Sequence, residues 1–153
     1  MKIFIGILLL TLSTIIGYTF SQKYKKRQDF FNDFEKFNKN LLNEVGFRQK
    51  PLRLVLSSVK NENDFYILTE KYLSNEKSNF NLNYLKKEEI DLYNNYLLEI
   101  GVGDVETQIK ILKSYESKLF DIAKSTAEEY KKYHTLYIKI GFLIGLILFI
   151  MLI

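Results

Sequence analysis

The stretch YLLEIGVGDVETQIKIL, residues 96–112, contains two of the seven glycines of the chain, Gly101 and Gly103. On both sides of them, apolar residues recur at the three- and four-residue spacing of an amphipathic helix. Gly101 follows the first of these helices directly, where a left-handed residue often ends a helix. Asp104 is a favoured N-cap for the second helix. We therefore predict a helix-to-helix corner at residues 101–104.

A Gly-x-Gly sequence before a helix is also found in phosphate-binding loops. The dinucleotide-binding pattern needs a strand before its glycines, whereas residues 96–100 continue a helical pattern, and the Gly-Lys-Ser/Thr of a P-loop is absent. Asp104 would also repel a phosphate at the N-terminus of the next helix. These observations favour a turn over a phosphate site.

Helical spacing continues outward from this corner over most of the chain, and no alternating strand pattern competes with it. Gly46 is a stop signal for the first helix, and Pro51 suits the first turn of the second. We expect the first helix to be continuous with the N-terminal apolar segment. The expected helices run to Gly46, from Pro51 to Val59, from Phe65 to Leu73, from about Leu85 to Ile100, and from Asp104 onward into the last apolar segment.

Both ends of the chain are apolar and nearly free of charge. Residues 3–20 are uncharged, and residues 137–153 carry only Lys139, whose long side chain can reach a membrane interface. Each segment is close to the roughly 17–25 residues that cross a bilayer. We predict transmembrane helices at residues 1–20 and 137–153. A cleaved signal peptide is the alternative for the first segment, although no small-residue cleavage site follows it.

Between these segments, residues 21–136 are expected to form an antiparallel helical bundle, so the fold class is all-α. The basic residues nearest the two segments lie on the side of this bundle: Lys23, Lys25, Lys26, Arg27, Lys124, Lys131, Lys132 and Lys139. The positive-inside rule then places the bundle in the cytoplasm and both termini outside.

Small residues occur four apart in both apolar segments, as Ser13 with Gly17 and as Gly141 with Gly145. Such residues let two membrane helices approach closely. We therefore consider packing of one segment against the other at these four positions.

The sequence contains no recognisable catalytic or metal-binding constellation. It has no cysteine and a single histidine, His134, which we expect at the membrane interface. Common zinc sites need several such ligands. The net charge of +4 comes with interspersed signs rather than the clustered basic face that binds nucleic acid. We expect no enzymatic activity, no cofactor and no nucleic-acid partner.

Several short sequences follow one another between the two apolar segments. They are YKKR at 24–27, LLNEV at 41–45, PL at 51–52, LKKEE at 85–89 and GVGDVETQ at 101–108, before the closing KIGFLIGLILFIMLI. Their order and spacing resemble those of the stage III sporulation protein AB family of endospore-forming bacteria. The turn of that family resembles Leu-Gly-x-Ser-Asp-x-x-x-Gln, and Gly103 stands here where its serine would be.

This resemblance implies a component of the channel apparatus between mother cell and forespore, in the mother-cell-derived membrane around the forespore. Its soluble part would be similar to the cytoplasmic domains of the F-type platform protein of type II secretion systems. The implied partners are the stage III sporulation protein AA-type ATPase and other membrane components of the channel. We expect a non-enzymatic platform that docks this ATPase, and a small pore-forming or holin-like protein is the alternative. The candidate partner-binding residues, at turns expected far from the membrane, are Glu44, Pro51, Gly101, Asp104 and Gln108.

Overall fold

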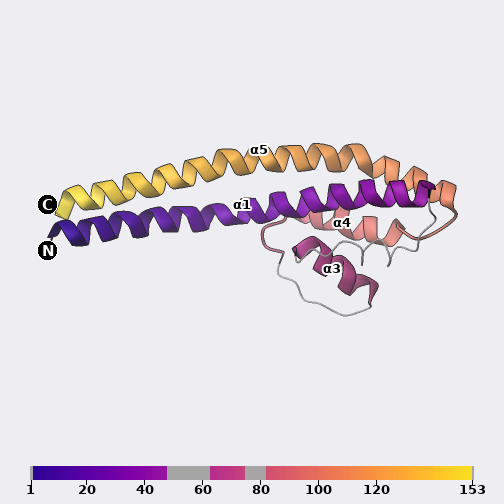
Figure 1. Ribbon diagram of the computed structural model, residues 1–153, viewed down its shortest axis with the longest axis horizontal. Helices are drawn as coiled ribbons and strands as arrows, with labels where there is room; N and C mark the ends of the chain where they lie inside the picture. Colours follow the sequence, from indigo (N-terminus) through magenta and orange to yellow (C-terminus); the bar gives the residue numbers. More distant parts are fainter. Residues whose placement is uncertain (1, 48–62, 75–81, 153) are drawn as a thin grey trace. The chain divides into compact units, whose positions relative to one another are not determined.

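The computed structural model describes residues 2–47, 63–74 and 82–152, and in these residues it contains helices and no strand (Figure 1). This confirms the predicted all-α fold. The predicted helix from Pro51 to Val59 lies outside the described residues. The four described helices are α1 (Lys2–Phe47), α3 (Asp64–Leu73), α4 (Lys87–Glu99) and α5 (Val105–Leu152).

The chain divides into two compact units. The terminal unit consists of residues 1–28 and 125–153, and the central unit of residues 29–124. Helices α1 and α5 each contribute one part to either unit, since neither apolar segment is separated by a helix breaker from the polar residues beside it. The membrane boundaries expected at residues 20 and 137 stay predictions.

In the terminal unit, α1 and α5 lie side by side and antiparallel, with the two chain ends together (Figure 1). Each helix contains a window long and apolar enough to cross a membrane. Only 11% of either window is buried in the structure. A core helix of a soluble protein would be mostly buried, so this exposure is what two helices surrounded by lipid would have.

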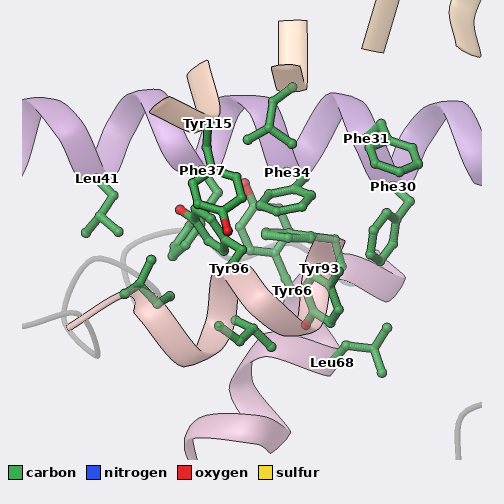
Figure 2. Packing of buried hydrophobic residues seen from close by; sticks show 14 of the residues in the cluster. Phe30, Phe31, Phe34, Phe37, Leu41, Tyr66, Leu68, Tyr93, Tyr96 and Tyr115 are labelled. Carbon is green, nitrogen blue, oxygen red and sulfur yellow. The ribbon is translucent and has the colours of Figure 1, made fainter. Parts of the chain in front are cut away.

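The core of the central unit is built mainly from aromatic rings (Figure 2). The ring of Phe65, from α3, lies at its centre, with its centroid 5.1 Å from that of Phe34 and 5.5 Å from those of Phe30 and Phe37. These rings contribute apolar burial and favourable edge-to-face and offset contacts. The other buried members of this core include Phe31, Leu41, Tyr66, Leu68, Tyr93, Tyr96, Leu112, Tyr115 and Leu119.

Two buried tyrosines of α4 differ in how their hydroxyl groups are satisfied. The Tyr93 hydroxyl lies 3.0 Å from the Thr69 hydroxyl, which in turn bonds the Phe65 carbonyl at 2.8 Å. The Tyr96 hydroxyl is buried and makes no hydrogen bond within the described part of the chain. A buried polar group without a partner costs stability, so the two hydroxyl groups have opposite effects on this core.

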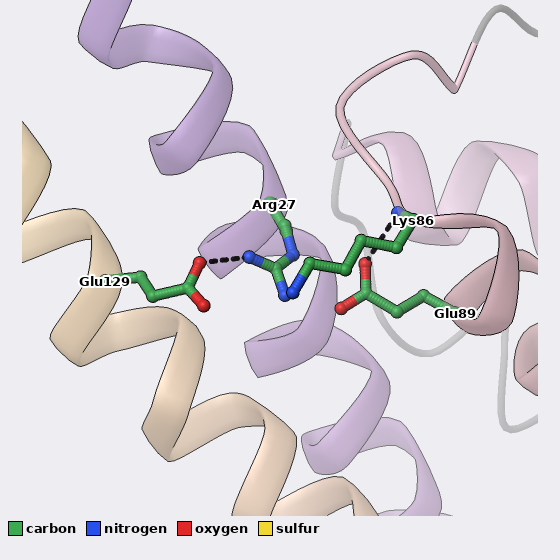
Figure 3. A network of polar contacts seen from close by, with 4 residues as sticks. All are labelled: Arg27, Lys86, Glu89 and Glu129. Atoms are coloured by element: carbon green, nitrogen blue, oxygen red, sulfur yellow. Dashed lines mark hydrogen bonds and ion pairs between the residues drawn. The ribbon is translucent and has the colours of Figure 1, made fainter.

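The polar groups at the starts of α3 and α4 are satisfied in different ways. The Glu89 carboxylate accepts the Lys86 N–H at 2.9 Å at the beginning of α4 (Figure 3). At the start of α3, Asn63 occupies the N-cap position without a capping side-chain bond. Its amide instead donates to the Asp33 carboxylate, so this side chain joins α3 to α1.

Candidate functional site

The corner between α4 and α5 has the backbone that its glycines predict. Gly101 has φ +80° and Gly103 has φ +91°, both in the region that side-chain-bearing residues rarely adopt. No described atom lies within 4 Å of where a Gly101 Cβ would stand. The glycine is therefore needed for its backbone conformation, and not because space is short.

Asp104 caps α5, as predicted. Its Oδ1 accepts the backbone N–H of Thr107 at 3.0 Å, which satisfies one of the free donors at the helix start. Hydrogen bonds from the side chain and backbone of Thr107 lower the pKa of the Asp104 carboxyl below its ordinary value. The carboxylate stays exposed and negatively charged at the surface of the corner.

Gln108, one turn into α5, fastens the corner with its side-chain amide. Its Oε1 accepts the Gly101 N–H at 2.8 Å, and its Nε2 donates to the carbonyls of Glu99, at 3.2 Å, and Val102. A donor on one side and two acceptors on the other fix the orientation of the amide. The side chain is 7% exposed, so it holds the corner from inside.

This fastened corner presents apolar side chains to the solvent. Leu98 is 63% exposed, Val102 62% and Val105 41%. Glu99 and Asp104, also exposed, lie among them in the sequence. We call these five residues the corner patch. The sequence interpretation missed its apolar members, although Leu98 lies outside the buried stripe of α4 and Val102 lies between two glycines.

The structure brings together three of the five predicted partner-binding residues. Gly101 and Asp104 are exposed at the corner, and Gln108 is buried beneath it. Glu44 lies half-buried near the end of α1, and Pro51 lies outside the described residues. For Gln108 the geometry gives a structural role, and a docking role for any of the five stays a prediction.

In the terminal unit, the four predicted packing residues meet where α1 and α5 cross closely. A Cβ on Gly17 would stand 2.4 Å from the Tyr137 carbonyl oxygen, and one on Gly141 2.7 Å from the Ser13 carbonyl oxygen. A Cβ on Gly145 would stand 2.8 Å from the Leu10 Cα. These backbone atoms cannot give way, so the close approach requires glycine.

A hydrogen bond adds to this contact, since the Ser13 hydroxyl donates to the Gly141 carbonyl at 2.6 Å. Beyond the apolar segments, polar and aromatic groups join the same two helices. The Ser21 hydroxyl donates to the Tyr18 carbonyl at 2.7 Å and lies 3.0 Å from His134 Nδ1. Because the serine proton is already used, we assign the proton of this second bond to the histidine nitrogen.

Further along, the rings of Tyr24 and Tyr133 stack with centroids 4.5 Å apart. Arg27 then forms an ion pair with Glu129 (Figure 3).

Within the described residues, no three histidine, cysteine, aspartate or glutamate side chains lie together as they would around a metal ion.

Comparison with known proteins gives one family. The family model described as stage III sporulation protein AB matches residues 2–79 and 60–153. These two matches together cover the chain from near its first residue to its last, which confirms the resemblance stated from the sequence. No curated protein and no solved structure gave a significant match.

Proposed function

Since this chain belongs to the stage III sporulation protein AB family and so acts in stage III of sporulation, we propose that it is a non-enzymatic membrane platform. In this proposal the terminal unit anchors the chain through α1 and α5. The central unit faces the mother-cell cytoplasm and docks the secretion-type ATPase of the channel apparatus, the stage III sporulation protein AA type.

The observation that carries the docking proposal is the corner patch. Exposed apolar side chains such as Leu98 and Val102 lose water-exposed surface when a partner covers them, which favours association. Two exposed apolar side chains do not stabilise a solvated turn, whereas they could form the apolar centre of an interface that has a polar rim.

The corner patch is also held in one shape. The amide of Gln108 bonds three backbone groups of the corner, and Asp104 caps α5. A rigid surface loses little conformational freedom on binding, so more of the contact energy remains as affinity. The carboxylates of Glu99 and Asp104 favour basic side chains on the partner.

The membrane part of the proposal is supported by the two exposed apolar windows and by the small residues packed between them. Lysine-rich sequences adjoin both windows on the side of the central unit. The positive-inside rule supports a cytoplasmic central unit. In this proposal the membrane is the mother-cell-derived one around the forespore.

The test compares the corner with another exposed apolar residue. Full-length chains carrying Leu98→Asp together with Val102→Asp are measured for binding to the ATPase, in detergent or nanodiscs, and for spore formation in cells. Tyr72→Asp is the control, because Tyr72 is 43% exposed on α3 and lies outside the corner patch.

We expect the double variant to bind the ATPase at least tenfold more weakly and to form fewer spores, while the control behaves like the wild type. Wild-type binding and sporulation by a folded double variant would exclude the corner patch as the docking surface. Ion leakage from cells that express the wild-type chain would instead favour the holin-like alternative.

A further inference from the structure

The terminal unit carries a group of lysines from both helices just beyond the apolar segments. They are Lys23, Lys25 and Lys26 on α1 and Lys131 and Lys132 on α5. Four of them are exposed, and Lys25 is half-buried. We call these five residues the lysine collar.

The antiparallel register brings both sets of lysines to the same level. The ring of Phe20 faces that of Tyr137 at 6.3 Å, and the ring of Tyr24 faces that of Tyr133 at 4.5 Å. The stack of Tyr24 on Tyr133 puts Lys132 at the same level along the two helices as Lys23 and Lys25. The sequence alone does not show this convergence.

Tyrosine rings lie beside three of these ammonium groups. Lys23 Nζ lies 5.1 Å from the centroid of Tyr24, and Lys132 Nζ lies 5.7 Å from that of Tyr133. Lys25 Nζ lies 5.5 Å from the centroid of Tyr130. A ring attracts a cation through its face without accepting its N–H bonds as an oxygen would, so Lys23 and Lys132 keep donors for an anionic oxygen.

Acidic side chains are scarce in this part of the chain. The terminal unit contains two, Glu128 and Glu129, and the Glu129 carboxylate binds Arg27. The lysine collar therefore has an excess of positive charge, next to segments that are themselves uncharged.

We propose that the lysine collar binds the negatively charged phosphodiester headgroups of anionic phospholipids. Tyr24 lies four residues beyond Phe20, about 6 Å along the helix, which is the depth of the headgroups if the apolar segments occupy the bilayer core. This inference rests on the membrane insertion that the proposed function includes. A lipid supplies both the phosphate and the acyl chains that cover the apolar segments, so it is the expected source of the anion.

The lysine collar is shared between two helices, so a bound headgroup also holds α1 and α5 together. Each lysine near an anionic surface strengthens binding by about fivefold. Removing all five should therefore abolish a preference for anionic lipid that can be measured.

The test uses the full-length chain in nanodiscs of phosphatidylcholine, with or without phosphatidylglycerol at about a third of the lipid. The thermal unfolding midpoint and the lipids retained in native mass spectrometry are both measured. The collar variant changes all five lysines to glutamine. The control changes five exposed lysines of the central unit to glutamine: Lys36, Lys87, Lys110, Lys113 and Lys118.

We expect phosphatidylglycerol to raise the midpoint by several degrees and to be retained selectively, in the wild type and in the control but not in the collar variant. A version with all five collar lysines changed to arginine should keep the preference. An unchanged response of the collar variant would overturn the inference. Equal stabilisation by inorganic phosphate in pure phosphatidylcholine would overturn the assignment to lipid.

Extraction of membranes with alkaline carbonate separates this inference from the proposed function. A chain released by carbonate is not inserted, which would overturn both. A chain that stays inserted and still shows no preference for phosphatidylglycerol would overturn the lipid site alone, because docking at the corner patch is measured independently.

Discussion

Replacing Gln108 by methionine tests how the corner is held. Methionine has a similar length and volume and no amide, so packing changes little while three hydrogen bonds are lost. The lost bonds are those to the N–H of Gly101 and to the carbonyls of Glu99 and Val102. The variant therefore isolates the polar contribution of this side chain.

The magnitude follows from how many groups lose a partner. One hydrogen bond contributes about 1 kcal/mol net to stability, so the loss of all three would cost roughly 3 kcal/mol. Glu99, Gly101 and Val102 are exposed residues, so water can hydrogen-bond to some of the backbone groups that lose the Gln108 amide. We expect Gln108→Met to lower the free energy of unfolding of the central unit by about 2 kcal/mol.

Urea titration of the full-length chain in detergent, followed by the near-ultraviolet circular dichroism of the aromatic core, measures this loss. Hydrogen–deuterium exchange gives a local readout, since the Gly101 amide should exchange faster. Lys110→Met is the control, because its bond to Glu106 at 3.1 Å is an exposed ion pair worth little.

Gln108→Glu sharpens the same test. A glutamate keeps an acceptor for the Gly101 N–H but turns a carboxylate toward two carbonyl oxygens. It should destabilise the corner more than methionine at pH 7 and recover part of the loss near pH 4. If Gln108→Met unfolds within 0.5 kcal/mol of the wild type and leaves the exchange of Gly101 unchanged, the amide does not hold the corner.

Three further predictions follow from the packing. Gly17→Ala should destabilise the pair of long helices by about 1–3 kcal/mol, as thermal unfolding in detergent would show. Gly6→Ala should cost less, because its added Cβ meets a movable ring rather than backbone, and equal losses would contradict this. Tyr93→Phe should lose about 1 kcal/mol in urea titration, whereas Tyr96→Phe should be neutral or stabilising, and the reverse order would be inconsistent with the hydroxyl contacts. Burial, followed by the nearby charge of an aspartate, raises the pKa of Tyr66 to about 12. Tyr66 of the unfolded chain ionises near pH 10, so stability should fall as the pH rises from about 10 toward 12; a Tyr66→Phe variant that loses the same stability over this range would contradict this.

Much of the fold was predictable because its signals are local. The helices ending near Gly46 and Leu73, the corner at Gly101 and the cap at Asp104 all depend on residues within one or two turns of each other. The start of α3 was less predictable, because Asn63 bonds Asp33, thirty residues earlier, instead of capping its own helix. The candidate site was half predictable: its glycines and cap were, but the exposure of Leu98 and Val102 was not.

The sequence by itself determined the helical elements, the two apolar segments, the glycine corner and the family, since periodicity, charge and turn residues are all written along the chain. Only the tertiary structure decided which residues of α1 meet which residues of α5. That register depends on the fit of backbones at Gly17 and Gly141, more than a hundred residues apart, where the missing Cβ atoms allow the contact. It in turn brings Lys23 level with Lys132, and the fold of the corner turns Gln108 from an exposed candidate into the side chain that holds it.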